Sequence, residues 1–197
     1  QDASRWLSFA EFAANVLNEP RKAVDILERS IRRCTHSSEL WLRLHLESEG
    51  IGTPLPRLRS VLGRGIAALN SATAESTGTS AAIVQELLLQ HADSVRRAAT
   101  ALAPGTDRTE LWAELRDVMG RAVQLAEVHN ADGSLCCQAL LHWMRLEAYA
   151  VRDVEKTLSV GHRLMKLWGG YYNVWTAFIA CVLFCLGDGA YETVRDL

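Results

Sequence analysis

The chain has 197 residues, 49% of them hydrophobic and 22% charged, so it is long and apolar enough to bury a substantial core. A net charge of −2 excludes a general electrostatic attraction to nucleic acid or to an acidic membrane surface. The 4 prolines and the scarcity of alternating β-branched runs favour an all-helical class. The longest apolar run, 178–186, is shorter than the roughly 20 residues that span a bilayer, so no membrane partner is expected.

Two amphipathic helices joined by a short turn are predicted first, over residues 4–17 and from about 20 to 34–36. Asn18 is expected to cap the second helix, and Pro20 to occupy its first turn, where the missing N–H costs nothing. A helix pair of this size cannot bury its apolar face alone. A stack of repeated pairs is therefore expected.

The same alternation of helices and turns is predicted along the rest of the chain. Ser37 or Ser38 should cap the third helix, which should end at residues 50–52, and the small polar residues 70–80 predict a loop. The remaining helices are expected over 58–69, 81–102, from 107 or 109 to 129, 153–168 and 174–186, with a turn at 130–133 and a last helix that begins at 191.

Tryptophan-centred segments recur and indicate a repeat. The opening Trp6-Leu7-Ser8-Phe9 returns as Trp41-Leu42-Arg43-Leu44, and related segments begin at Trp143 and Trp175. The second helices share a core of two aliphatic residues, a small or acidic residue and a basic residue, at 26–31, 61–66, 118–123 and, more loosely, 159–164. The small residues in these segments are expected to let neighbouring helices approach closely. The predicted repeat core consists of Trp6, Phe9, Trp41, Leu44, Trp143, Leu146, Trp175 and Phe178.

These segments resemble the half-a-TPR (HAT) repeat, which pairs a Trp-centred first helix with an aliphatic-aromatic-Glu-Arg-Ala-Leu second helix. The resemblance implies an all-α fold, an α-solenoid of antiparallel helix pairs like that of TPR proteins. It covers nearly the whole chain as one array, with units at 1–36, 37–78, 79–132, 133–170 and a partial unit at 171–197. The chain departs from the family at Val84, in place of a first-helix Trp, and at Gly63, Gly120 and Gly161, in place of Glu.

The order of unit lengths is similar to that of HAT proteins that recycle the U4/U6 snRNP. This resemblance implies a nuclear, non-catalytic scaffold in pre-mRNA splicing that forms a homodimer. It also implies protein partners, among them splicing factors and ubiquitin-specific proteases, and only indirect or weak contact with RNA. Two alternatives stay open: a HAT subunit of a pre-mRNA 3′-end cleavage complex, and a TPR-like adaptor that holds a short peptide in its groove.

Residues able to support catalysis or metal binding form no recognised pattern. Cys136 and Cys137 are adjacent, and Cys181 and Cys185 are four apart, whereas a zinc site needs paired C-x-x-C or His ligands. Reduced, buried cysteines in the cytosol or nucleus are expected instead. The six His residues lie near no nucleophile motif, and no Gly-rich loop follows a strand. The sequence therefore predicts no enzyme activity, no catalytic residue, no metal and no cofactor.

Five cations of the second helix are predicted to form a basic stripe: Arg21, Lys22, Arg29, Arg32 and Arg33. Such a stripe could contact RNA phosphates or an acidic partner. The alternative is a solvated outer face that Asp25 and Glu28 partly neutralise.

The helix expected over 174–186 is apolar on more than one stripe, so a single neighbouring helix cannot cover it. Exposed apolar surface of this kind often marks an interface. A symmetric dimer is therefore predicted, with Phe178, Leu183, Phe184 and Tyr191 near its centre. The alternative is that residues beyond Leu197 complete the fold.

Overall fold

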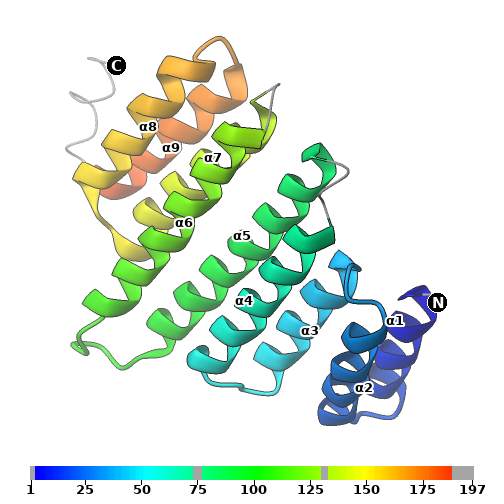
Figure 1. Cartoon of the computed structure of the whole chain (residues 1–197). Helices are drawn as coiled ribbons and strands as arrows, with labels where there is room; N and C mark the ends of the chain where they lie inside the picture. The colour runs from blue at the N-terminus through cyan, green and yellow to red at the C-terminus, as the bar shows by residue number, and fades with distance from the viewer. Residues whose placement is uncertain (1–2, 73–76, 130–132, 188–197) are drawn as a thin grey trace. The chain divides into compact units, whose positions relative to one another are not determined.

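The computed structural model describes residues 3–72, 77–129 and 133–187. These residues form nine α-helices and two short π-helical segments without any strand, and the all-helical class is confirmed (Figure 1). In chain order the elements are α1 (Ala3–Glu11), η1 (Phe12–Val16), α2 (Pro20–Arg33), α3 (Ser38–Gly50), α4 (Leu55–Ala72), α5 (Thr77–Ala101), α6 (Thr109–His129), α7 (Ser134–Leu146), η2 (Glu147–Val151), α8 (Val154–Trp168) and α9 (Tyr172–Leu186).

Most helix ends lie near their predicted positions, but two details differ. Asn18 does not cap α2: it has a left-handed backbone with φ of 55°, and Glu19 is the N-cap residue, followed by Pro20 as predicted. The loop expected over 70–80 is wrong at both ends, since α4 continues to Ala72 and α5 begins at Thr77. Alanine is the best helix former, and each Ser or Thr of this stretch costs at most about 0.7 kcal/mol in a helix. The helix predicted from 191 lies outside the described residues.

The chain divides into two compact units, Gln1–Ser94 and Val95–Leu197, and the division falls inside α5. The predicted repeat boundaries at 36/37 and 170/171 fall in the turns that precede α3 and α9, whereas the boundary at 78/79 falls inside α5. The single array and its unit boundaries stay a prediction.

In the first unit α1 packs against α2, α2 against α3 and α3 against α4, and α1 also contacts α3 (Figure 1). The part of α5 in this unit is tied to α3 by polar contacts. His45 Nε2 lies 3.1 Å from His91 Nδ1, and both rings are buried. The Ser94 hydroxyl donates to Glu49 Oε2 at 2.8 Å. The apolar core of this unit includes Ala23, Leu27, Leu40, Trp41, Leu44, Leu58, Leu62, Leu87 and Leu88.

In the second unit α7 packs against both α6 and α8, and α9 contacts α8 and α7. Its core is formed by apolar residues of α6, α7, α8 and α9. It includes Leu115, Val118, Met119, Ala122, Val123, Leu140, Met144, Leu164 and Phe178.

Glycine permits a close helix contact at Gly161 but not at Gly63 or Gly120. A methyl group on Gly161 of α8 would overlap the ring of Phe178, which is fully buried in α9. Nothing lies within 4 Å of a methyl group placed on Gly63 or Gly120. The predicted close approach is thus found at Gly161 and also at Gly65 of α4, where a methyl group would lie 3.3 Å from the Trp41 ring, but not at Gly63 or Gly120.

Gly161→Ala is expected to destabilise the chain by about 1–3 kcal/mol, because the added methyl must displace a buried aromatic ring. Gly63→Ala is the matched control. It makes the same change at an exposed helical position and is expected to stabilise by about 0.5–1 kcal/mol through helix propensity. Urea unfolding of both variants measures the difference, and equal stability of the two would contradict the contact with Phe178.

Candidate functional site: a charged cleft beside α2 and α4

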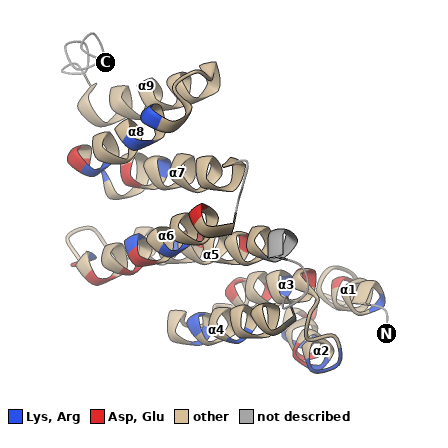
Figure 2. Cartoon of the chain, turned by 45° about the horizontal axis from the view of Figure 1, so that its top comes forward, with Lys and Arg blue, Asp and Glu red and all other residues tan. Residues whose placement is uncertain are grey.

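A cleft of about 730 Å³ lies in the first unit, where α2, the turn after α3 and the first half of α4 meet. Charged side chains come from both helices, and the turn contributes small and aliphatic residues. The lining consists of Arg21, Val24, Asp25 and Glu28 from α2, Ser48 from α3, Ile51, Gly52, Thr53 and Pro54 from the turn, and Arg57, Ser60, Val61 and Arg64 from α4. Figure 2 shows basic positions on both α2 and α4, and acidic positions on α2.

Helical spacing explains which α2 side chains reach the cleft. Arg21, Asp25 and Glu28 stand at i, i+4 and i+7 and therefore share one face of the helix. Lys22, Arg29 and Arg33 stand at i, i+7 and i+11 on a neighbouring face and do not line the cleft. Lys22 pairs instead with Glu19 at 2.9 Å, and Arg29, Arg32 and Arg33 are exposed. The structure thus distributes the five predicted cations over two faces.

Arg64 and Glu28 bridge α4 and α2 along one side of the cleft. The guanidinium donates from Nη2 to Glu28 Oε1 at 2.7 Å and from Nη1 to Oε2 at 3.1 Å. Hydrogen bonding to Glu28 raises the pKa of Arg64, and the guanidinium also lies 5.7 Å from the centre of the Trp41 ring. Both side chains are partly exposed, so the pair fixes geometry more than it adds stability.

Arg21 and Arg57 are exposed, and in the described residues neither has an ion-pair partner. Arg21 is the second residue of α2 and Arg57 the third residue of α4, and no acidic residue occupies either first turn. The helix dipole places positive partial charge at these N-termini, where a cation costs about 0.3–1 kcal/mol. Two cations and two positive helix ends therefore meet at one cleft, and Glu28 is already engaged by Arg64.

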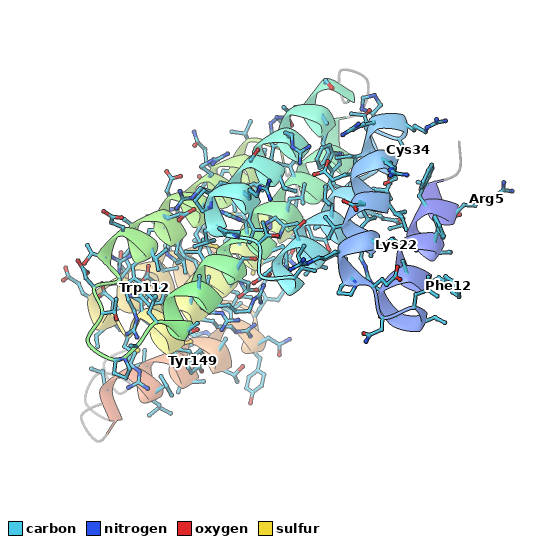
Figure 3. All side chains as sticks on the ribbon, turned by 90° about the horizontal axis from the view of Figure 1, so that it is seen from below. Arg5, Phe12, Lys22, Cys34, Trp112 and Tyr149 are labelled. Atoms are coloured by element: carbon cyan, nitrogen blue, oxygen red, sulfur yellow. The ribbon has the colours of Figure 1, made fainter. Side chains whose placement is uncertain are left out.

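The predicted repeat core is only partly buried. Trp41, Leu44, Leu146 and Phe178 are buried, and Trp6, Trp143 and Trp175 are half-buried. Phe9 is 50% exposed, so it is not a core residue. The buried side chains of α1 and η1 are Ala10 and Ala13, and Phe9 lies on a neighbouring face with Phe12 and Val16, which are also exposed. In Figure 3 Phe12 and Arg5 point outward from this end of the chain.

The residues predicted for a dimer interface are not equally available. Phe178 is fully buried within its own chain against Gly161 and His162, so it has no surface to offer a second copy. Leu183 and Phe184 are about half exposed. The Phe184 ring packs edge-on against Tyr149, with centroids 4.6 Å apart. Tyr191 lies outside the described residues.

The five cysteines are free thiols, and Cys136 and Cys181 are buried. Burial raises the pKa of Cys136, Cys137 and Cys181, which makes these thiols less reactive. Over the described ranges, no three His, Cys, Asp or Glu side chains are grouped so as to hold a metal ion. The absence of metal, cofactor and catalysis stays a prediction.

A second charged cluster surrounds Glu147, which is fully buried in the second unit. Arg116 donates to it from Nε at 2.9 Å and from Nη2 at 2.8 Å, and the Trp143 indole donates at 2.9 Å. Arg116 Nη2 also lies 2.7 Å from Asp153 Oδ2, and Asp153 caps α8 through the Lys156 amide. Every group in this cluster is engaged, so its role is to join α6, η2 and α8.

Sequence reasoning found Arg21 and missed Arg57 and Arg64. The available signal was the spacing of Arg57 and Arg64 at i and i+7, which puts them on one face of α4. The sequence pattern assigns Arg64 only to the repeat core at 61–66, and the apolar positions of this helix define its buried face but not the face that carries the two arginines.

Neither the protein-family models nor the curated proteins contain a match to this chain. The likeness to HAT repeats therefore rests on the residues quoted above. Over the ranges that the structure describes, none of the helices has the length and hydropathy needed to cross a bilayer.

Proposed function

We propose that this chain is a non-catalytic protein-interaction scaffold of the HAT class, built as an α-solenoid of antiparallel helix pairs. Helix packing within each unit supports this reading. In the first unit α1 packs against α2, α2 against α3 and α3 against α4; in the second unit α6 packs against α7, α7 against α8 and α8 against α9. In addition, α1 contacts α3 and α7 contacts α9. Contacts between successive and alternate helices are the pattern expected when helix pairs stack.

The observation that carries the proposal is an irregular junction that occurs twice, between α1 and α2 and between α7 and α8. Both first helices end in a π-helical segment and a nearby left-handed residue: η1 is followed by Leu17 and then Asn18 with φ of 55°, and η2 is followed directly by Arg152 with φ of 62°. In both, the next backbone N–H donates to a carbonyl six residues earlier, at 2.9 Å and 3.1 Å. Recurrence of so uncommon a junction favours a repeated helix pair.

The shared junction also changes the alignment of the repeats. If Asn18 is aligned with Arg152, then Trp143 aligns with Phe9 and not with Trp6. The indoles of Trp41 and Trp175 do act alike: each donates to the carbonyl six residues earlier, Thr35 at 2.8 Å and Gly169 at 2.7 Å. The second and last predicted units thus share this indole hydrogen bond at the start of their first helix.

Within this class, the unit order resembles the C-terminal HAT half of the U4/U6 snRNP recycling factor known as squamous cell carcinoma antigen recognised by T cells. The proposed role is therefore nuclear: assembly or recycling of the U4/U6 snRNP in pre-mRNA splicing. The proposed partners are splicing factors, ubiquitin-specific proteases and a second copy of the chain. Leu183 and Phe184 are the exposed members of the proposed dimer interface.

The alternatives are a HAT subunit of the 3′-end cleavage complex and a TPR-like peptide-binding adaptor. The charged cleft beside α2 and α4 favours the peptide-binding adaptor, because it offers a concave site in which Arg21 and Arg57 have no ion-pair partner in the described residues.

The test is capture of defined partners by the purified chain. We expect it to bind ubiquitin-specific proteases and to retain U4/U6 particles from nuclear extract. Selective retention of the 3′-end cleavage complex would favour that alternative, and retention of neither complex, with no protease bound, would refute the assignment. Light scattering tests the dimer. A monomer mass at tens of micromolar would contradict self-association, and a dimer that Phe184→Glu dissociates without unfolding would support it.

A further inference from the structure

We propose that the charged cleft beside α2 and α4 binds an extended acidic segment of a partner protein, anchored by Arg21 and Arg57. The inference deepens the proposed scaffold function and rests on it, since it names the chemistry of one partner contact. It uses only side chains that line one cleft in the first unit.

The positions of Arg21 and Arg57 oppose the stability of their own helices. Each cation stands in the first turn of a helix, at the positive end of the dipole, and no acidic side chain shares that turn. The carboxylate of Glu19, the N-cap residue of α2, is paired with Lys22 at 2.9 Å. Local choices that weaken a fold without a compensating contact are expected at functional sites. A bound carboxylate would meet both guanidinium groups and both helix ends, and would remove this unfavourable interaction.

The existing acidic residues do not already fill this role. Glu28 is held by two hydrogen bonds from Arg64, and this pairing keeps its carboxylate from neutralising the other two arginines. Asp25 is the remaining acidic residue in the lining and has no ion-pair partner in the described residues. Three arginines against two carboxylates leave the cleft with one net positive charge.

The rest of the lining suits a peptide backbone. The volume of the cleft, about 730 Å³, lies within the usual range of ligand sites, roughly 300–1,000 Å³. Thr53 and Ser60 supply hydroxyls that can donate to peptide carbonyls, and Asp25 can accept from a peptide N–H. Val24, Ile51 and Val61 provide aliphatic surface for the apolar atoms of such a segment.

The lining fits RNA less well than an acidic peptide. It contains no aromatic side chain on which a base could stack. Asp25 and Glu28 would repel a continuous row of phosphates, whereas a peptide can space its carboxylates and present amides between them. The more uniformly basic face of α2, with Lys22, Arg29 and Arg33, lies outside the cleft.

The experiment measures binding of a fluorescein-labelled peptide of alternating Glu and Ser by fluorescence anisotropy. An oligouridine RNA of equal charge is the competing probe. Arg21→Glu/Arg57→Glu is expected to lower peptide affinity by about tenfold or more, since two attractions become repulsions. Arg29→Glu/Arg33→Glu is the matched control: it changes the charge equally on the other face of α2 and should leave the affinity within about twofold.

Thermal unfolding separates lost binding from lost structure. Arg21→Glu/Arg57→Glu puts carboxylates at two helix N-termini, so its melting temperature should stay the same or rise while binding falls. A lower melting temperature, an equal loss of affinity in both double variants, or no peptide binding by the unaltered chain would overturn the proposal. Tighter RNA binding that depends on Arg21 and Arg57 would also overturn it.

The same variants separate this inference from the proposed function. If the chain captures the proteases or U4/U6 particles but does not bind the peptide, the cleft proposal fails alone. If the peptide binds through Arg21 and Arg57 but none of those partners is captured, the splicing assignment fails and the cleft proposal stands.

Discussion

Arg116→Ala is expected to destabilise the second unit by about 3 kcal/mol, because it leaves the fully buried Glu147 carboxylate without its cation. Removing one member of a buried pair usually costs about 3–5 kcal/mol, and the lower end applies because the Arg116 side chain is 35% exposed. The substitution also removes the contact with Asp153, the residue that caps α8. Urea unfolding followed by circular dichroism measures the loss.

Two further variants identify the cause. Arg121→Ala removes an exposed cation from the same helix, with no ion-pair partner in the described residues, and should change stability by less than about 0.5 kcal/mol. Arg116→Met/Glu147→Leu replaces both charges by apolar groups and should recover much of the loss, because no buried charge then lacks a partner. Arg116→Ala as stable as Arg121→Ala would show that Glu147 is not held by Arg116.

The sequence was sufficient to predict the helices, because apolar residues at helical spacing must face a common core. The sequence was not sufficient where the helical and the loop conformation of a segment are close in free energy. Residues 70–80 read as a loop from their size and polarity, yet α4 and α5 extend into this stretch. The π-helical segments η1 and η2 were not foreseen either, since one added residue in a turn leaves almost no signature in the apolar pattern.

The residues of the cleft could likewise be predicted only in part from the sequence. Spacing along α2 could place Arg21 with Asp25 and Glu28 on one face, but it could not show that this face meets α4. Phe178 and Phe9 show that burial, too, cannot be predicted from repeat position alone. Both are aromatic at repeat positions, yet Phe178 is fully buried and Phe9 is half exposed, because only tertiary packing decides which face of a helix is covered.

Trp41→Ala is expected to destabilise the first unit by about 3–5 kcal/mol, through the cavity left by a large buried side chain. The ring is 3% exposed, and Gly65 of α4 leaves room for it, since a methyl group there would lie only 3.3 Å away. The indole N–H donates to the Thr35 carbonyl at 2.8 Å. Truncation would therefore remove the contact of this ring with Gly65 and leave the Thr35 carbonyl without its donor.

Trp143→Ala provides the contrast in the second unit. Both tryptophans belong to the predicted repeat core, but Trp143 is half-buried and Arg116 still satisfies Glu147 after truncation. Its expected loss is about 1–3 kcal/mol. Trp41→Phe keeps an aromatic ring, loses the N–H donor and should cost about 1–2 kcal/mol. Urea unfolding of the three variants orders them, and a Trp41→Ala loss no larger than that of Trp41→Phe would refute the packing of this ring between α3 and α4.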